Sequence, residues 1–269
     1  MNTNQLKKFA KEARIKLITQ IGVKLDFVLT QDTAELRGKS SELTQLRSKL
    51  SELGREQLIE TVAYTWFNRL MALRFMDANG YNTPKVVTPL QGMSNPEILQ
   101  NALAGNVEED LKLDRQRLND LIDGRTSSSD AQTEAFKLLL VASCNKWHSA
   151  MPLMFERISD YTELLLPDDL LSDFSIVSDI RNGMSDEDCS QEELIGWLYQ
   201  FYISDKKDEI FGQIVVLIIE SESKFELNNQ LQDVLSKYEF PKEVYFIKEF
   251  IRTESGKVNR LKTKELFFK

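Results

Sequence analysis

Glycine is scarce in this 269-residue chain and is spread thinly along it. The chain has 11 glycines, and no two of them lie closer than 12 residues apart. Loops that hold nucleotide phosphates place at least two glycines within roughly six residues of each other, because the backbone must approach the phosphate closely. The spacing therefore excludes GxG, GxGxxG and Walker-type loops from this sequence.

Residues that commonly bind metals are also few. His148 is the only histidine, and Cys144 and Cys189 lie 45 residues apart in no CxxC pair. Because a zinc site takes several Cys or His ligands at short spacing, the sequence predicts no metal site. We interpret His148 as a satisfied residue near a helix end and both cysteines as reduced and structural.

No two prolines are adjacent in the sequence. An adenine-specific DNA methyltransferase needs an Asn/Asp-Pro-Pro-Tyr/Phe segment to grip the flipped base, so methyl transfer by this chain alone is not predicted. Neighbouring acids occur at Asp168 and Asp169 and again at 186–188. Such acids usually face water or cap a helix, and we assign them no chemistry.

Long apolar runs are absent as well. The longest, at 214–219, is far shorter than the roughly 20 residues that cross a membrane. The first five residues are polar and do not resemble a signal peptide. We therefore expect a cytoplasmic protein that is not bound to a membrane.

Acidic residues outnumber basic ones, and unevenly so. Residues 1–211 hold 24 Lys+Arg against 33 Asp+Glu, whereas residues 212–269 hold 10 against 9, which together give the net charge of −8. The segment 160–209 is the most acidic and would repel a phosphate backbone. One basic cluster lies in the opening helix and is interpreted as a solvated helix face: Lys7, Lys8, Lys11, Arg14 and Lys16. We expect weak or no direct DNA binding.

Apolar residues recur at steps of three and four through most of the first 160 residues, which predicts helices. Gly22 is expected to end or bend the first helix. A leucine stripe from Leu36 to Leu53 favours an intramolecular helical hairpin over an oligomer interface. The helix at 56–77 is apolar around most of its circumference and should be buried. Further helices are expected at 96–103, 108–122, 131–148 (capped by Asp130) and 190–204.

The pattern changes after Phe211. The expected elements are a buried strand at 214–219, a short helix at 226–237, a strand at 244–247, a turn at 253–256 followed by a short strand, and a last helix at 262–268. The predicted fold class is therefore α+β: a large helical domain, residues 1–207, followed by a small βαββα subdomain, residues 208–269. So small a unit is expected to dock on something.

Three segments carry a resemblance to a known family: AYTWFNRLMALRFMD at 63–77, YTELLLPDDLLSDF at 161–174 and IGWLYQFYIS at 195–204. Through them, residues 1–210 resemble the N-terminal region of the PglX-type adenine-specific DNA methyltransferases of BREX phage-defence systems. In that family this region is a helical lead-in to a larger enzyme, whose S-adenosylmethionine site and base-gripping motif come later. The resemblance implies a domain without a cofactor of its own, with the methyltransferase core or other phage-defence proteins as partners.

Residues from about 209 onward resemble the C-terminal lid of an adenylate-forming acyl-CoA ligase, of the o-succinylbenzoate-CoA ligase kind. The matching segments are EIFGQ at 209–213, YEFPK at 238–242 and RTESGKVNR at 252–260, with Ile251 in place of the usual proline. The resemblance implies that Lys257 is catalytic only when a partner adenylation domain is present. That domain would bind ATP and the carboxylic acid that is then joined to CoA. Lys257 would then steady the carboxylate and the α-phosphate. From the residues alone, Lys257 is an ordinary exposed lysine after a turn.

These observations support one hypothesis and leave alternatives open. The first is a truncated, non-catalytic N-terminal domain of a phage-defence adenine-specific DNA methyltransferase that acts by binding partners. The second is a ligase lid that completes a partner adenylation domain, in which case Lys257→Ala matters only when that partner binds. The third is an inert fusion of the two parts.

Overall fold

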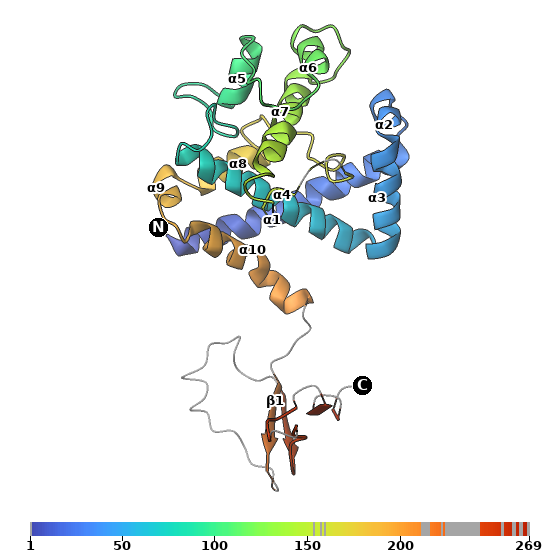
Figure 1. Ribbon diagram of the computed structural model, residues 1–269, viewed down its shortest axis with the longest axis vertical. Helices are drawn as coiled ribbons and strands as arrows, with labels where there is room; N and C mark the ends of the chain where they lie inside the picture. Colours follow the sequence, from blue (N-terminus) through green and yellow to red (C-terminus); the bar gives the residue numbers. More distant parts are fainter. Residues whose placement is uncertain are drawn as a thin grey trace. The chain divides into compact units, whose positions relative to one another are not determined.

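The computed structural model describes residues 2–152, 154–156, 158, 160–210, 216–221, 223, 243–253, 256–259, 262–263 and 266–267. The chain divides into two compact units, Met1–Ile203 and Ser204–Lys269. Helices build the first unit, and the second contains two strands (Figure 1). The described part is thus mostly helical with a small sheet, an α+β arrangement. None of its helices combines the length and the hydropathy that crossing a membrane requires.

The first helix, α1 (Thr3–Thr30), is 28 residues long and is capped at its start by the side chain of Asn2. Gly22 does not end this helix, so that part of the expectation was wrong. Leu25 and Val28 continue the buried stripe beyond the glycine, so the helix keeps an apolar face to pack. Burial of these side chains outweighs the roughly 1 kcal/mol that a glycine costs inside a helix.

The leucine-bearing region forms two helices where one was expected, α2 (Ala34–Gly38) and α3 (Ser40–Leu53). Lys39 separates them, with φ −111° and ψ 40°. Gly54, at φ 77°, then reverses the chain into α4 (Arg55–Ala78). Because α3 packs directly against α4, the favoured intramolecular hairpin is confirmed.

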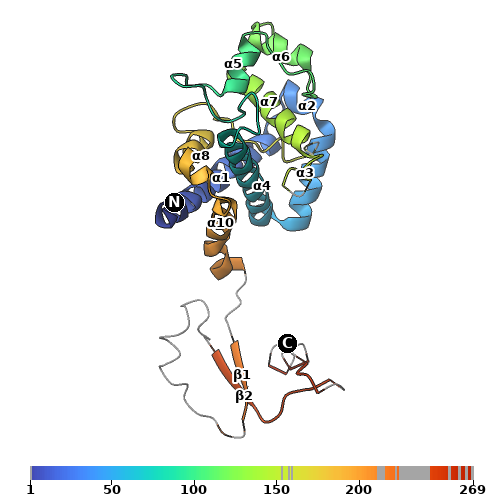
Figure 2. The same ribbon diagram turned by 60° about the vertical axis from the view of Figure 1, so that its left-hand side comes forward.

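Helix α4 is the centre of the first unit. It contacts α1, α3 and two short helices nearer the end of the unit, and Figure 2 shows it among its neighbours. Side chains on every side of it are buried, including Trp66 and Phe67, so its predicted central position is confirmed. Asn79 caps its C-terminal end, and Gly80 follows in the left-handed region, with φ 71°.

Three further helices follow the loop after α4: α5 (Glu97–Leu103), α6 (Arg115–Ile122) and α7 (Ala131–Trp147). Helix α6 begins later than expected because Asp114 caps it, accepting a hydrogen bond of 2.9 Å from the backbone N–H of the third helical residue. Asp130 caps α7 in the same way, at 3.0 Å, as the sequence predicted.

The last part of the first unit holds α8 (Ile176–Gly183), α9 (Asp186–Cys189) and the beginning of α10 (Leu194–Ile210). The sequence analysis missed α8 and α9, which are short and start at the capping serines Ser175 and Ser185. Helix α10 is the aromatic-rich helix that was expected, with a later start and a later end.

In the second unit, β1 (Val216–Glu220) and β2 (Glu243–Ile247) pair in parallel. Both were predicted as strands. Parallel strands need a crossover connection, and the helix expected there, at 226–237, lies outside the described residues. Of the expected last helix, at 262–268, residues 262–263 are helical and 266–267 form a turn, and the other three lie outside the described residues. The complete βαββα order therefore stays a prediction.

Candidate functional site

Lys257, the catalytic residue that the ligase resemblance implies, follows a tight turn in the second unit. An antiparallel bridge between Arg252 and Val258 closes this turn. The N–H of Gly256 donates to the carbonyl of Thr253 at 2.8 Å, and Gly256 has a φ of 79°, which favours glycine. The predicted turn before Lys257 is confirmed.

The end of β1 anchors this turn. Glu220 Oε2 accepts hydrogen bonds from Arg252 Nη2 at 2.7 Å and from the backbone N–H of Phe250 at 3.0 Å. The Lys257 side chain is exposed. The backbone carbonyl of Lys257 accepts a hydrogen bond of 2.8 Å from the backbone N–H of Thr253. The turn thus presents an ammonium group to the solvent on a fixed backbone.

His148 and the two cysteines occupy structural positions, as predicted. His148 Nδ1 lies 2.8 Å from the carbonyl oxygen of Phe155. Both cysteines are buried and free, and burial raises the pKa of Cys144 to about 12 and that of Cys189 to about 11. Such thiols are poor nucleophiles at neutral pH. Within the described ranges, no cluster of His, Cys, Asp and Glu could hold a metal ion.

The basic cluster of α1 does not form one solvated face, and this interpretation is corrected. Arg14 points inward and pairs with Glu60 at 2.5 Å, while Lys16 pairs with Asp179 at 2.5 Å. Three members are exposed: Lys7, Lys8 and Lys11. The surface available to a phosphate backbone is therefore smaller than the sequence suggested.

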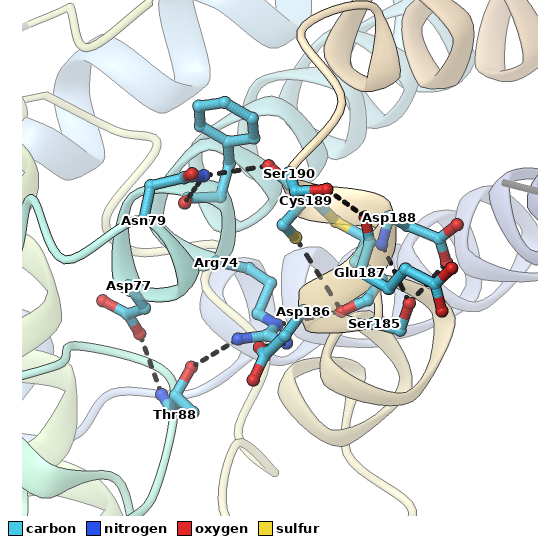
Figure 3. A network of polar contacts seen from close by, with 12 residues as sticks. Arg74, Asp77, Asn79, Thr88, Ser185, Asp186, Glu187, Asp188, Cys189 and Ser190 are labelled. Atoms are coloured by element: carbon cyan, nitrogen blue, oxygen red, sulfur yellow. Dashed lines mark hydrogen bonds and ion pairs between the residues drawn. The ribbon is translucent and has the colours of Figure 1, made fainter.

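The buried side chain of Arg74 links α4 to α9 in a polar network (Figure 3). Its Nε donates to the carbonyl of Met184 at 3.0 Å, and its Nη2 pairs with Asp186 Oδ1 at 2.5 Å. Its Nη1 donates to Thr88 Oγ1 at 3.3 Å. Asp186, to which the sequence assigned only a capping or solvated role, therefore also forms a structural ion pair.

The Asp77 carboxylate is fully buried and holds the loop that follows α4. It accepts hydrogen bonds from the backbone N–H groups of Val86 at 2.9 Å, Val87 at 2.8 Å and Thr88 at 2.9 Å, and from Asn82 Nδ2 at 2.7 Å. Burial raises the pKa of Asp77 above its usual range, although these hydrogen bonds oppose the shift. With its oxygens engaged by four donors, Asp77 positions a loop and is not available as a general base.

A cavity of about 590 Å³ opens between α1, α2, α6, α7 and the segment 163–168. Apolar side chains line part of it, among them Phe27, Leu36 and Leu138. Charged side chains of both signs also line it in equal number: Lys24, Lys39, Arg117 and Lys137 with Asp130, Glu134, Glu163 and Asp168.

Asp168 lies at this cavity between two lysines. Its Oδ1 is 2.5 Å from Lys24 Nζ and 2.9 Å from Lys137 Nζ, while Glu163 pairs with Lys39 at 2.7 Å. Burial raises the pKa of Asp168 and the two ammonium groups lower it by more, so that it lies below its usual range. Sequence reasoning noticed Asp168 but missed both lysines, since neither lies in a motif and they belong to different helices.

Comparison with known proteins relates the chain to adenine-specific methyltransferases over most of its length. Adenine-specific methyltransferase BrxX of Escherichia coli O9:H4 (strain HS) is 36% identical over 258 residues, which cover 80% of this chain and 19% of BrxX. PglX of Lacticaseibacillus casei (strain Zhang) is 29% identical over 249 residues, which cover 78% of this chain and 20% of PglX. No model of a known protein family matches the chain.

The chain thus spans about a fifth of the length of the curated relatives it matches. The predicted resemblance to PglX-type methyltransferases is confirmed by these two relatives. Neither relative supports the predicted likeness of residues 209–269 to a ligase lid, which stays a prediction together with the role of Lys257.

Proposed function

We propose that this chain is a non-catalytic interaction module of an adenine-specific methyltransferase of a phage-defence system. The proposal rests on the extent of the match with BrxX, which covers 80% of this chain but only 19% of the length of BrxX. The chain also has no glycine-rich loop and no Pro-Pro segment, the sequence features expected of a phosphate-binding loop and of the base-gripping site. The methyl-transfer chemistry then belongs to parts of the relatives outside the match.

An exposed apolar stripe on α1 supports the role in binding. Ile15, Val23 and Phe27 are exposed and are spaced eight and four residues apart, which places them on one face of the helix. Large apolar side chains gathered on a helix face commonly mark protein contacts. The predominantly acidic charge of residues 1–211 disfavours DNA as the partner of the first unit. We therefore propose that this stripe contacts the core of the methyltransferase.

The test uses BrxX from which the region homologous to this chain has been removed. The purified chain should bind this shortened BrxX in calorimetry and should not bind intact BrxX, whose own region already occupies the contact. Val23→Glu should weaken the binding about tenfold or more, because it buries a charge in an apolar contact. Met93→Glu, at another exposed apolar residue that lies in a loop, is the control and should leave the affinity unchanged. Equal affinity for both forms of BrxX would contradict the proposal, and so would the absence of binding to either form.

The second candidate is a ligase lid, and the observation that favours it is the exposed Lys257 after its glycine turn. A lid of this kind would restore ATP–pyrophosphate exchange to an acyl-CoA ligase that has lost its C-terminal domain. Lys257→Ala should abolish that restoration, whereas Lys262→Ala, which removes another exposed lysine, should not. No restoration by the unaltered chain would eliminate this candidate.

A further inference from the structure

Phe174 is the most exposed large apolar side chain among the described residues, with 81% of its surface accessible to solvent. It comes two residues before the start of α8. One exposed apolar side chain is ordinary on a protein surface. Two further features distinguish Phe174, the hydrogen bonds that fix its backbone and the surface beside which it lies.

The backbone on both sides of this ring is held in place. The N–H of Phe174 donates to Ser172 Oγ at 3.2 Å, and its carbonyl accepts a hydrogen bond from Lys16 Nζ. Asp169 fixes Ser172 in turn, because its carboxylate accepts hydrogen bonds from the Ser172 N–H at 3.1 Å and from the Ser172 hydroxyl at 2.5 Å. The next residue, Ser175, is buried and caps α8. The exposed ring therefore projects from a backbone that has little freedom.

The segment 168–174 is tied to α1 at both of its ends. Asp168 pairs with Lys24 at 2.5 Å, and the carbonyl of Phe174 accepts the hydrogen bond from Lys16. Each of these two lysines directly follows a member of the exposed apolar stripe of α1 described above. At 3.6 residues per turn, Lys16 also falls within the angle that the stripe covers around the helix. Phe174 thus lies next to this stripe and extends the apolar surface beyond α1.

The extent of the match with the relatives indicates what covers this surface. The region similar to this chain makes up about a fifth of BrxX and of PglX, so most of each relative lies outside it. A region joined covalently to a much larger body meets that body at a high effective concentration. The acidic segment 160–209, which contains Phe174, disfavours DNA as the occupant.

We infer that Phe174 is the anchor residue of the contact with the methyltransferase core, and that its ring inserts into an apolar pocket of that core. Asp169 is a positioning residue, which holds the turn through Ser172. An aromatic side chain on a fixed backbone loses little conformational freedom on association, so more of the free energy of burial contributes to affinity. The inference rests on the proposed function, because it names the main residue of the contact proposed there.

Calorimetry of the full chain with the shortened BrxX tests the anchor. Phe174→Ala should weaken the binding by about thirtyfold or more, the loss that defines a hot-spot residue. Tyr81→Ala is the matched control and should leave the affinity unchanged. Tyr81 is a 63% exposed aromatic residue, and it lines a cavity to which α1 contributes no residue. Phe174→Ala should leave the melting temperature unchanged, because so exposed a side chain contributes little to folding, and this separates loss of the contact from loss of the fold.

Asp169→Ala separates positioning of the ring from a direct contact. It frees the turn but keeps the ring, so it should weaken the binding severalfold and by less than Phe174→Ala does. In a chain that already carries Phe174→Ala, the same substitution should have no further effect, because no ring is left to position. A further loss of the same size in the double variant would overturn the role given to Asp169.

Failure of this inference can be distinguished from failure of the proposed function. If a folded shortened BrxX does not bind the unaltered chain, the proposed function fails and this inference fails with it. If the chain binds and Phe174→Ala keeps the full affinity, this inference alone fails. An equal loss in Tyr81→Ala would also overturn it, since the binding would then respond to any exposed aromatic residue.

Intact BrxX provides a measurement that does not depend on the shortened form. The residue of BrxX that aligns with Phe174 is replaced by the photoreactive amino acid p-benzoylphenylalanine, and the cross-linked peptides are identified by mass spectrometry. We expect cross-links to peptides outside the region similar to this chain. Cross-links that stay within this region, or that join two copies of BrxX, would overturn the inference.

Discussion

Arg74 and Asp186, 112 residues apart in the sequence, are joined by an ion pair of 2.5 Å between Nη2 and Oδ1. The pair ties the central helix α4 to α9. Its two ends lie in different surroundings, since the Arg74 side chain is 5% exposed and that of Asp186 is 77% exposed. The two residues should therefore contribute unequally to stability.

Arg74→Ala is expected to lower the free energy of unfolding by about 2–5 kcal/mol, because it leaves the Met184 carbonyl without its donor and opens a buried space. Asp186→Ala should lower it by less than about 1 kcal/mol, as for other exposed ion-pair partners. Urea denaturation of the two variants measures both values. Equal losses would show that the ion pair itself, and not the buried guanidinium, supports the contact.

Gly183 at the end of α8 lies against the ring of Phe9. A Cβ atom at position 183 would be 2.3 Å from Phe9 Cδ2 and 2.4 Å from Cγ, so the whole ring would have to move. Gly183→Ala should therefore destabilise the first unit by about 1–3 kcal/mol. Gly196→Ala in α10, where nothing lies within 4 Å, should be neutral or stabilising by up to about 1 kcal/mol. The melting temperature of Gly183→Ala should fall, whereas that of Gly196→Ala should stay unchanged or rise. An equal shift in both variants would contradict this packing.

Asp77→Asn should destabilise the chain although it keeps the shape of the side chain. The amide has one acceptor oxygen in place of two, so N–H groups among Val86, Val87 and Thr88 lose their partners in a buried site. We expect a loss of about 2–4 kcal/mol in urea denaturation. Asp26→Asn, which alters an exposed ion pair with Arg55, is the control and should cost less than about 1 kcal/mol. Similar losses for both substitutions would argue against the role given to Asp77.

The pKa of Asp168, which lies below its usual range, makes its contribution to stability depend on pH. A carboxyl whose pKa is lowered by folding stabilises the protein above its unfolded pKa, about 4, and loses this effect as the pH falls through the lower folded pKa. Asp168→Asn should therefore be less stable than the unaltered chain near pH 7, and the difference should shrink in acid. Denaturation curves measured across that range provide the test. A difference that does not change with pH would mean that the two lysines do not act on the charge of Asp168.

Much of the helical unit could be predicted because its apolar pattern is strong. The helix around Trp66 is apolar around most of its circumference, and this pattern predicted its central position. Capping by Asp130 followed from its place before an apolar run. The prediction at Gly22 failed because the cost of one glycine is local, whereas the benefit of continuing the buried stripe depends on the partner helix.

The candidate cavity could not be predicted. Lys24 and Lys137 lie on different helices with no motif around either, and only the fold brings both to Asp168. The helices α8 and α9 were missed for a related reason. They are too short for periodicity to show, and the serines at 175 and 185 that begin them are ambiguous between caps and turns.

The central claim, that the chain is an interaction module without methyl transfer of its own, is tested most directly by a methylation assay with labelled S-adenosylmethionine. The purified chain and intact BrxX are compared on the same DNA at equal concentration, with binding of the cofactor followed by calorimetry. The account predicts methylation by BrxX, and neither methylation nor cofactor binding by this chain. Saturable binding of S-adenosylmethionine together with methyl transfer to DNA by the chain alone would contradict it.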